Sequence, residues 1–262
     1  MNGKHQARKR FGQHFLIDPA VISQIVAAIA PQKGDILVEI GPGQGAITIP
    51  LSRFPASLHA IEFDRDLVPI LRRRFADDER VTVHEADALR FDYSTLGRRL
   101  RIVGNLPYNI STPLIFKLIE FRDNIFDLHF MMQKEVVNRM AASPGNKSYG
   151  RLTVMLGCFM EVVPLFEVPP TAFAPPPKVT SAVVRMRPKP ADTLLLDDPK
   201  TLSTLVAQAF SQRRKTLRNA LKGHVTEVEM ESVGINPGSR AEEVPIDTWV
   251  ELANRLHTDS LC

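Results

Sequence analysis

The feature that most constrains the fold is a glycine-rich turn placed directly after a short apolar segment. Ile36–Ile40 (ILVEI) leads into Gly41-Pro42-Gly43-Gln44-Gly45, and another apolar segment follows. A strand, a glycine turn and a helix in this order are typical of a nucleotide-binding βαβ unit. Glu62 ends the next predicted strand about 20 residues beyond Gly41, where a carboxylate accepts hydrogen bonds from both hydroxyls of a ribose. The pattern therefore predicts a cofactor that contains adenosine.

Strand and helix patterns alternate along the following chain. Such alternation predicts an α/β fold, a Rossmann-like, mostly parallel sheet covered by helices on both faces. Asp18 and Pro19 are typical of a helix N-cap and first helical residue, so we expect the first helix to run to about Ala30. Further helices are expected at 67–75, 112–121 and 134–142, and strands at 58–62, 81–84, 101–104 and 126–132, with the apolar segments 152–163 and 181–186 completing a seven-stranded sheet.

Two proline-containing segments interrupt this pattern. Residues 164–178 are too rich in proline for a helix or a central strand, so we expect an ordered loop or an extended arm. Residues 187–192 (RPKPAD) are typical of a linker, and helices are expected beyond it at 202–221 and 247–256. The sequence thus predicts a catalytic domain at 1–187 and a small all-α domain at 193–262 that contacts RNA.

Acidic residues near the glycine turn favour S-adenosylmethionine as the cofactor. Glu39 would repel a pyrophosphate but could hold the cationic amino acid part of S-adenosylmethionine, and no Lys-Ser/Thr pair supplies a phosphate anchor. Asp87 follows the third predicted strand, where its carboxylate could accept from the adenine amino group. Gly41, Glu62 and Asp87 then lie on three loops at the carboxyl edge of one sheet, where open α/β folds bind ligands. These features predict a class I S-adenosylmethionine-dependent methyltransferase.

The fourth strand ends in Gly104-Asn105-Leu106-Pro107-Tyr108, which suits an adenine amine as the methyl acceptor. That amine is a poor nucleophile because its lone pair is delocalised into the ring. Hydrogen bonds accepted by the Asn105 side-chain oxygen and a main-chain carbonyl such as that of Leu106 favour a pyramidal nitrogen that can attack a methyl group. Pro107 keeps the loop rigid, and Tyr108 offers a face for stacking an extruded base.

Basic residues gather at two places on an otherwise acidic chain. The N-terminal cluster includes Arg8, Lys9 and Arg10, and residues 200–224 carry six basic residues and no acidic one. A polyanionic partner is expected because phosphate contacts release counterions. Arg213, Arg214, Lys215 and Arg218 are expected near one face of a helix, and with Lys222 they form the second set of predicted RNA contacts. Only two cysteines occur and no long apolar segment is present, so we expect a protein of the reducing cytoplasm.

Five blocks in order resemble the KsgA/RsmA family of ribosomal RNA adenine dimethyltransferases. They are RFGQHFL (10–16), VEIGPGQGAIT, NLPYNIS, AFAPPPKVTSAVVR and FSQRRKTLRN, and they span the chain to about Asn219. The resemblance implies transfer of two methyl groups to each of two adjacent adenines in a hairpin loop near the 3′ end of the small-subunit (16S) rRNA, during small-subunit biogenesis. It implies that Asn105 and Tyr108 face the target base and that Phe173 forms the second aromatic wall of the base pocket. It also implies contacts with the cofactor from His14, Leu16, Gly41, Glu62, Asp87 and Asn105.

Three alternatives stay open at the level of sequence. An erythromycin-resistance-type methyltransferase acting on 23S rRNA would share the cofactor loops, although the QRRKTLRN segment favours the small subunit. An assembly factor acting mainly by binding the immature small subunit is a second alternative. A small-molecule methyltransferase is a third, and the basic clusters count against it. We expect a monomer, because a partner the size of an RNA accounts for the basic surface without a second subunit. We expect no metal ion, because the histidines are scattered without metal-ligand spacing.

Overall fold

The computed structural model describes residues 14–107, 109–190, 193 and 196–259, which divide into two compact units. The first unit contains residues 1–137 and 163–188, and the second contains 138–162 and 189–262. The first unit ends inside the predicted linker. The units differ from the predicted domains 1–187 and 193–262 in the segment 138–162, which belongs to the helical unit. The division into a catalytic domain at 1–187 and a helical domain at 193–262 stays a prediction.

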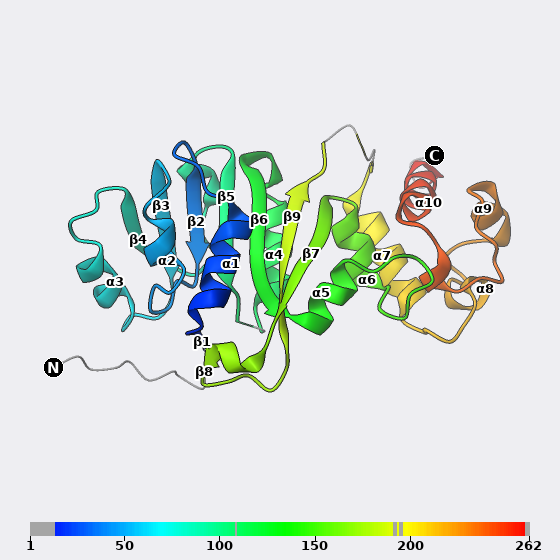
Figure 1. Cartoon of the computed structure of the whole chain (residues 1–262). Coiled ribbons are helices and arrows are strands. Elements are labelled where there is room, and N and C mark those ends of the chain that lie inside the picture. The colour runs from blue at the N-terminus through cyan, green and yellow to red at the C-terminus, as the bar shows by residue number, and fades with distance from the viewer. Residues whose placement is uncertain (1–13, 108, 191–192, 194–195, 260–262) are drawn as a thin grey trace. The chain divides into compact units, whose positions relative to one another are not determined.

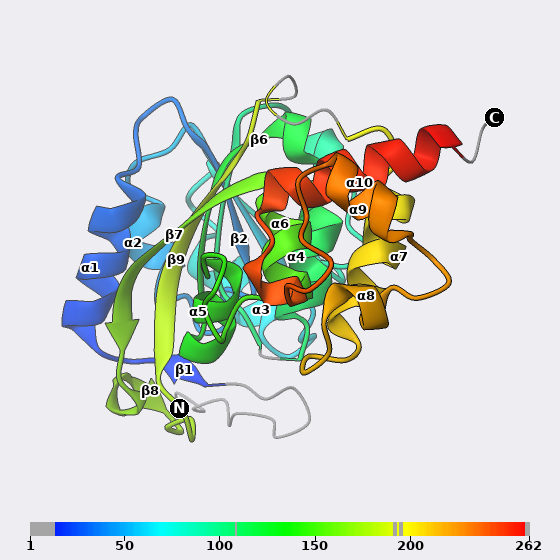
Figure 2. The same cartoon turned by 90° about the vertical axis from the view of Figure 1, so that its right-hand side faces the viewer.

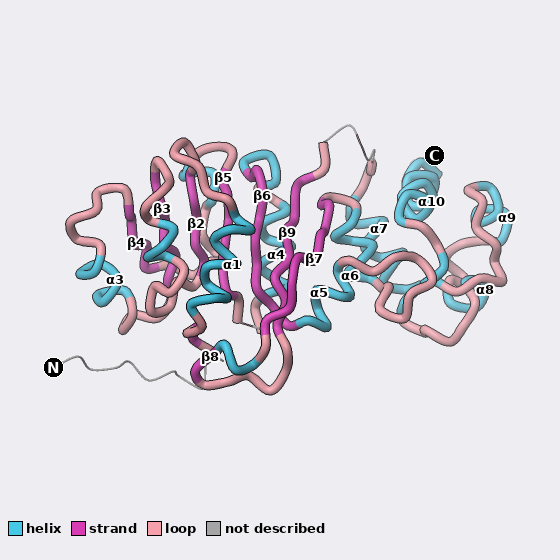
Figure 3. The backbone as a smooth tube through the Cα atoms, in the orientation of Figure 1, coloured by secondary structure: helices cyan, strands magenta, loops and turns pink. Residues whose placement is uncertain are grey.

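Within the described residues, seven strands form one sheet in the order β4-β3-β2-β5-β6-β9-β7 (Figure 3). The pairs β3/β4, β2/β3, β2/β5 and β5/β6 are parallel, whereas β9 runs antiparallel to β6. The predicted mostly parallel α/β sheet is therefore confirmed. The strands are β2 (Ile36–Ile40), β3 (Ser57–Glu62), β4 (Val81–Glu85), β5 (Leu100–Asn105), β6 (Ile125–Gln133), β7 (Met160–Val168) and β9 (Ser181–Pro188).

Helices cover both faces of this sheet, as predicted. Asp18 caps α1, because its side chain accepts a hydrogen bond from the Ala20 amide at 2.8 Å. Figure 2 shows α1 and α2 on one side of the sheet and α4 on the other. The helices before β7 are α1 (Pro19–Ile29), α2 (Thr48–Leu51), α3 (Val68–Arg74), α4 (Ser111–Ile119), α5 (Lys134–Met140) and α6 (Arg151–Gly157).

The prediction of one strand over 152–163 is wrong. Residues 151–157 form α6, and the strand β7 begins only at Met160. All residues from 152 to 157 are buried, so the helix is covered on every side beyond Arg151. A continuous apolar run of this kind has no period that separates a buried helix from a buried strand. β7 then continues through Pro164, which an edge strand of the sheet tolerates.

Arg101 ties the start of β5 to three neighbouring elements. Its guanidinium donates to both carboxylate oxygens of Asp127 on β6, at 3.0 and 2.8 Å, and to Asp35 at 2.7 Å. It also donates to the carbonyl oxygens of Ile29 and Ala30 at the end of α1. Only 9% of the Arg101 side chain is exposed. The ion pairs and the helix cap together fix α1 against the sheet.

A short second sheet lies at the carboxyl ends of the parallel strands (Figure 1). It pairs β1 (Phe15–Leu16) antiparallel with β8 (Phe173–Ala174). Residues 169–178 therefore form an ordered arm that carries a short strand, as predicted, whereas residues 164–168, which were expected in the same arm, belong to β7. A segment near the N-terminus and one near residue 173 are thus held next to each other beside the ends of the main strands.

The second unit is helical and packs around Trp249, which is fully buried. The Tyr149 hydroxyl donates to the Val244 carbonyl oxygen at 2.7 Å, which joins the inserted segment 138–162 to this core. Beyond α6, its helices are α7 (Pro199–Phe210), α8 (Leu217–Ala220), α9 (Glu227–Ser232) and α10 (Ile246–Asp259). In the part of the chain that the structure describes, no helix has the length and apolar character needed to cross a membrane.

The prediction of one continuous helix over 202–221 is wrong. α7 ends at Phe210, and residues 211–216 form a turn before α8. Ser211 ends the helix, because its hydroxyl donates to the Gln208 carbonyl oxygen at 2.7 Å and competes with the backbone ladder. Thr216 has an extended backbone, with ψ at 159°. The basic residues 213–218 therefore do not share one helical face.

Candidate active site

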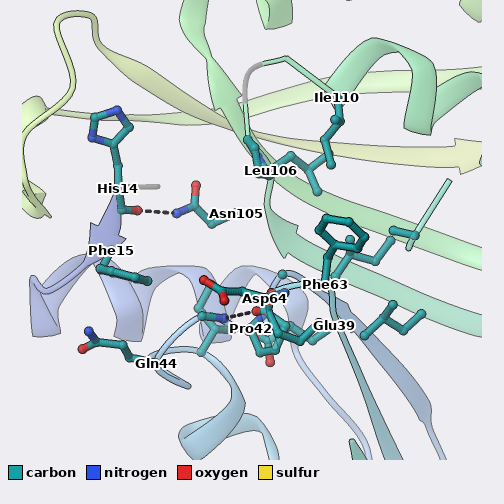
Figure 4. A pocket seen from close by; sticks show the side chains of 18 of the residues that line it. His14, Phe15, Glu39, Pro42, Gln44, Phe63, Asp64, Asn105, Leu106 and Ile110 are labelled. Carbon is teal, nitrogen blue, oxygen red and sulfur yellow. Dashed lines mark hydrogen bonds between the residues drawn. The ribbon is translucent and has the colours of Figure 1, made fainter. Parts of the chain in front are cut away.

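A cavity of about 300 Å³ opens at the carboxyl ends of the parallel strands (Figure 4). Its walls come from the loops after β2, β3, β4 and β5, together with β1 and β8. This is the position at which open α/β sheets bind ligands. The predicted site residues that line it are His14, Leu16, Gly41, Glu62, Asp87, Asn105, Leu106, Pro107 and Phe173.

Two glycines of the turn leave the backbone bare at the wall of this cavity, between the side chains of Pro42 and Gln44. Gly41 and Gly43 have φ angles of +67° and +58°, a region that residues with a side chain rarely adopt. A Cβ atom on Gly43 would lie 3.2 Å from the Phe15 ring. The turn can therefore approach a ligand closely, and the Phe15 ring of β1 packs directly over it.

The Glu62 carboxylate is fixed between two loops. One oxygen accepts from the Asp64 amide at 2.8 Å, and the other accepts from the Gly43 amide at 3.1 Å. Burial raises the pKa of Glu62, while these backbone hydrogen bonds oppose the rise. Each oxygen retains acceptor capacity, so the side chain is held ready for a pair of hydroxyl donors. Asp87 lies on the next loop, where its Oδ1 accepts from the Leu89 amide at 2.9 Å.

Glu39 is a buried carboxyl group on the wall of the same cavity. Only 2% of the residue is exposed, and its Oε2 atom has no hydrogen-bond partner among the described residues. Burial raises the pKa of Glu39 to about 7, against an opposing effect of the neighbouring Thr48 side chain and with a smaller contribution from the charge of Glu62. A cationic ligand in the cavity would supply the missing partner for this carboxyl group.

Asn105 connects the end of β5 to the N-terminal strand. Its Nδ2 atom donates to the His14 carbonyl oxygen at 3.0 Å, which turns the Oδ1 atom away from His14 (Figure 4). The His14 ring is in turn 2.8 Å from the Pro175 carbonyl oxygen. Phe173 pairs with Leu16 and is buried on the cavity wall. One chain of contacts thus links the Asn105 loop, β1 and the proline-rich arm.

Other predicted site residues lie elsewhere. Tyr108 and the N-terminal Arg8, Lys9 and Arg10 are outside the described residues. The second basic set lies in the helical unit, and all its members are exposed: Arg213, Arg214, Lys215, Arg218 and Lys222. Within that unit, Arg213 donates to the Lys147 carbonyl oxygen at 2.6 Å, and Arg218 pairs with Glu227 at 2.8 Å. Their contacts with RNA stay a prediction.

Several apolar residues of the cavity wall were not among the predicted site residues, and Phe15, Phe63 and Ile110 are three of them. Phe63 directly follows the ribose-binding candidate Glu62 and is 61% exposed, which is unusual for a phenylalanine. Its position next to that acid was an available signal. Phe15 and Ile110 meet the cavity only through contacts between distant segments, which no local pattern indicates.

Comparisons with known proteins agree with this architecture. A sequence model described as "Ribosomal RNA adenine dimethylase" matches residues 4–258. A chain from Ralstonia nicotianae named "Ribosomal RNA small subunit methyltransferase A" is 55% identical, with 98% of this chain and 92% of the relative covered. A relative of the same name from Aromatoleum aromaticum is 52% identical, with 98% and 97% covered.

Solved structures show the same fold. The crystal structure of a dimethyladenosine transferase from Plasmodium falciparum superposes with a TM-score of 0.83 at 26% identity and covers 94% of this chain and 98% of that chain. The 23S rRNA methyltransferase ErmE superposes with a TM-score of 0.74 at 24% identity, covers 93% and 99%, and supports the fold alone. Taken with the match over residues 4–258, these findings show that the chain belongs to the ribosomal RNA adenine dimethylase family.

Proposed function

We propose that this chain transfers methyl groups from S-adenosylmethionine to the exocyclic amines of two adjacent adenines near the 3′ end of small-subunit rRNA. The names of the relatives support an rRNA small-subunit methyltransferase, and the name of the family supports dimethylation of adenine. The single observation that carries the proposal is the position of Asn105. Its side chain ends β5 at the wall of the cavity that Glu39, Glu62 and Asp87 also line.

The residues of the cavity fit S-adenosylmethionine, which supplies a methyl group on a sulfonium when bound. Glu62 has two fixed carboxylate oxygens for the ribose hydroxyls, and Asp87 suits the adenine amino group. The orphaned oxygen of Glu39 suits the cationic amino acid part. Gly41 offers close backbone approach, and His14 and Leu16 would close the cavity from the N-terminal side.

The methyl acceptor is an adenine that has been extruded from the RNA. Asn105 Oδ1 and the Leu106 carbonyl oxygen accept hydrogen bonds from its amine, which localises the nitrogen lone pair for attack. The bond from Asn105 Nδ2 to the His14 carbonyl oxygen fixes which end of the amide faces the base. Pro107 stiffens this loop, and Phe173 supplies a wall against which the base stacks. Tyr108, which lies outside the described residues, is the proposed second stacking partner.

No general base is required in this scheme. The amine loses its proton to solvent only after the methyl group has moved, so the chain acts by positioning and by polarising the lone pair. After the first transfer, one N–H remains for a hydrogen bond to Asn105 or Leu106. For the second transfer, the pocket must have room for the methyl group that the amine already carries, on the side that faces the methyl donor.

The basic clusters would hold the RNA by its phosphates. Arg8, Lys9 and Arg10 precede the segment that lines the cavity, and Arg213, Arg214, Lys215, Arg218 and Lys222 form the second set. Contacts of this kind position an RNA without reading its bases. We also propose that the protein acts as a monomer in the cytoplasm, uses no metal ion, and acts on the immature small subunit.

Methyl transfer to defined substrates tests this function. The purified chain is incubated with labelled S-adenosylmethionine and unmethylated small subunits, large subunits or free adenosine, and the labelled nucleoside is identified. We expect dimethyladenosine on small subunits alone. Label on large subunits would favour a resistance-type enzyme, label on adenosine would favour a small-molecule enzyme, and tight subunit binding without transfer would favour an assembly factor.

A further inference from the structure

An exposed aromatic ring lies at the end of the sheet opposite the cavity and is surrounded by arginines. Phe126, near the start of β6, is 37% exposed. The guanidinium carbon of Arg99 lies 4.6 Å from the centre of its ring, and those of Arg187 and Arg101 lie at 5.6 and 5.7 Å. These distances are within the range of cation–π interactions. The ring therefore orders guanidinium groups from the start of β5 and from the end of β9.

Two of these arginines keep an uncompensated charge. Arg101 is buried and paired with Asp35 and Asp127. Arg99 and Arg187 are exposed, and among the described residues no acidic side chain lies within ion-pair distance of either. Two ordered and unpaired guanidinium groups form a ready binding surface for an anion.

Further charged groups surround His129, which is buried on the same strand as Phe126. Its pKa is lowered to about 4, mainly by burial; among the charges, Asp127 opposes this shift, whereas Arg101, Arg185 and Arg187 add to it. Arg99 also has a φ angle of +57°, which a residue with a side chain rarely adopts. Such a backbone costs roughly 1–3 kcal/mol and is found disproportionately at binding sites.

This surface lies far from the cavity. Arg99 precedes β5, Phe126 begins β6 and Arg187 ends the antiparallel β9, so all three lie at the amino ends of the parallel strands (Figure 1). The cavity is at the carboxyl ends. Arg99 precedes Asn105, which lines the cavity, by six residues, and Phe126 precedes Met131, the strand partner of Asn105, by five, so the two levels lie roughly 17–20 Å apart. A partner that reaches both places must be large, as a folded rRNA is.

We propose that Arg99 and Arg187, ordered by Phe126, bind phosphates of a second segment of the RNA whose adenines enter the cavity. This inference rests on the proposed function. Planar guanidinium groups match the geometry of phosphate oxygens and are weakly hydrated, which favours an RNA backbone over other anionic partners. The surface would orient the folded RNA and would contribute no base recognition.

Salt-dependent binding to naked small-subunit rRNA tests the inference. In the variant R99Q/R187Q, we expect affinity near 0.15 M salt to fall roughly 5- to 30-fold, and the slope of log K against log salt to decrease by about one to two units. The matched control R53Q/R73Q removes two exposed arginines elsewhere on the same unit and should change the slope less. The variant R99K/R187K keeps both charges and should retain most of the slope.

Methylation of a short hairpin RNA separates this inference from the proposed function. A hairpin that only fills the cavity cannot span both sites, so R99Q/R187Q should methylate it at the wild-type rate. Equal slopes for R99Q/R187Q and the control would overturn the inference. Binding that is weakened on intact subunits but unchanged on naked rRNA would also overturn it, because a ribosomal protein would then be the partner. Failure of the wild-type chain to methylate any RNA would instead refute the proposed function.

Discussion

Replacing Glu39 by glutamine should stabilise the protein at high pH. In the folded chain, burial raises the pKa of Glu39 from its ordinary value of 4.5 to about 7. The native state then binds the proton more tightly than the unfolded state, so the free energy of unfolding decreases as pH rises from 4.5 to 7. A difference of about 2.5 pKa units corresponds to about 3 kcal/mol at pH 8. Glutamine does not ionise, and E39Q avoids this cost.

The same substitution should weaken binding of the cofactor. A neutral glutamine loses the attraction to a cationic amino group, and we expect affinity for S-adenosylmethionine to fall about tenfold, equivalent to about 1.4 kcal/mol. A gain in stability with a loss of binding is typical of a residue that is retained for function.

Urea unfolding at two pH values measures the effect. At pH 8, E39Q should be more stable than the wild type by about 3 kcal/mol. At pH 5 the difference should be less than about 1 kcal/mol, because Glu39 is then protonated in the folded state and pH 5 lies only slightly above the pKa of the unfolded state. E161Q, at an exposed position of β7, is the control and should show no such difference. An equal stability change at both pH values would refute the reasoning, since it would show that Glu39 has the same pKa in the folded and unfolded chain.

Three further substitutions test other parts of the site and fold. R101M leaves Asp35 and Asp127 without their cation and should cost about 3–5 kcal/mol in urea unfolding; a cost below about 1 kcal/mol would contradict the network. N105A should lower kcat about 10²- to 10³-fold while the cofactor Kd changes less than about tenfold, and equal losses in both would contradict a role toward the base. G43A, with φ at +58° and a Cβ atom 3.2 Å from the Phe15 ring, should weaken cofactor binding in calorimetry; wild-type affinity would show that the turn tolerates a side chain.

The sheet and the cofactor loops were predictable because their signals are local. Each strand from 36 to 132 is a short apolar run followed by a turn, and the acids after the strands fall in register at one edge. Glu62 and Asp87 could therefore be placed by counting along the chain. The helix cap at Asp18 depends on two neighbouring residues and was predictable for the same reason.

The errors arise where local patterns have more than one solution. The apolar run 152–163 is compatible with a buried helix and with a buried strand. Residues 151–157 form a helix because they pack against the core around Trp249. The break at 211–216 depends on the hydroxyl of Ser211, a weak signal inside a strongly helical sequence.

Contacts between distant segments gave no signal in the sequence. The bond from Asn105 to the His14 carbonyl oxygen spans 91 residues, and the ion pair of Arg101 with Asp35 spans 66. Nothing near either residue indicates its partner. The charge state of Glu39 could not be predicted from the sequence either, because its burial depends on the whole sheet and the surrounding loops.

The measurement that tests the central claim most directly is the position of the methyl groups in the RNA. Unmethylated small subunits are incubated with the wild-type chain and S-adenosylmethionine, with N105A as the control, and the rRNA is digested and analysed by mass spectrometry. We predict dimethyladenosine at two adjacent positions of one hairpin loop near the 3′ end, and almost none with N105A. Methyl groups at another site or on another base, or equal modification by N105A, would contradict the account.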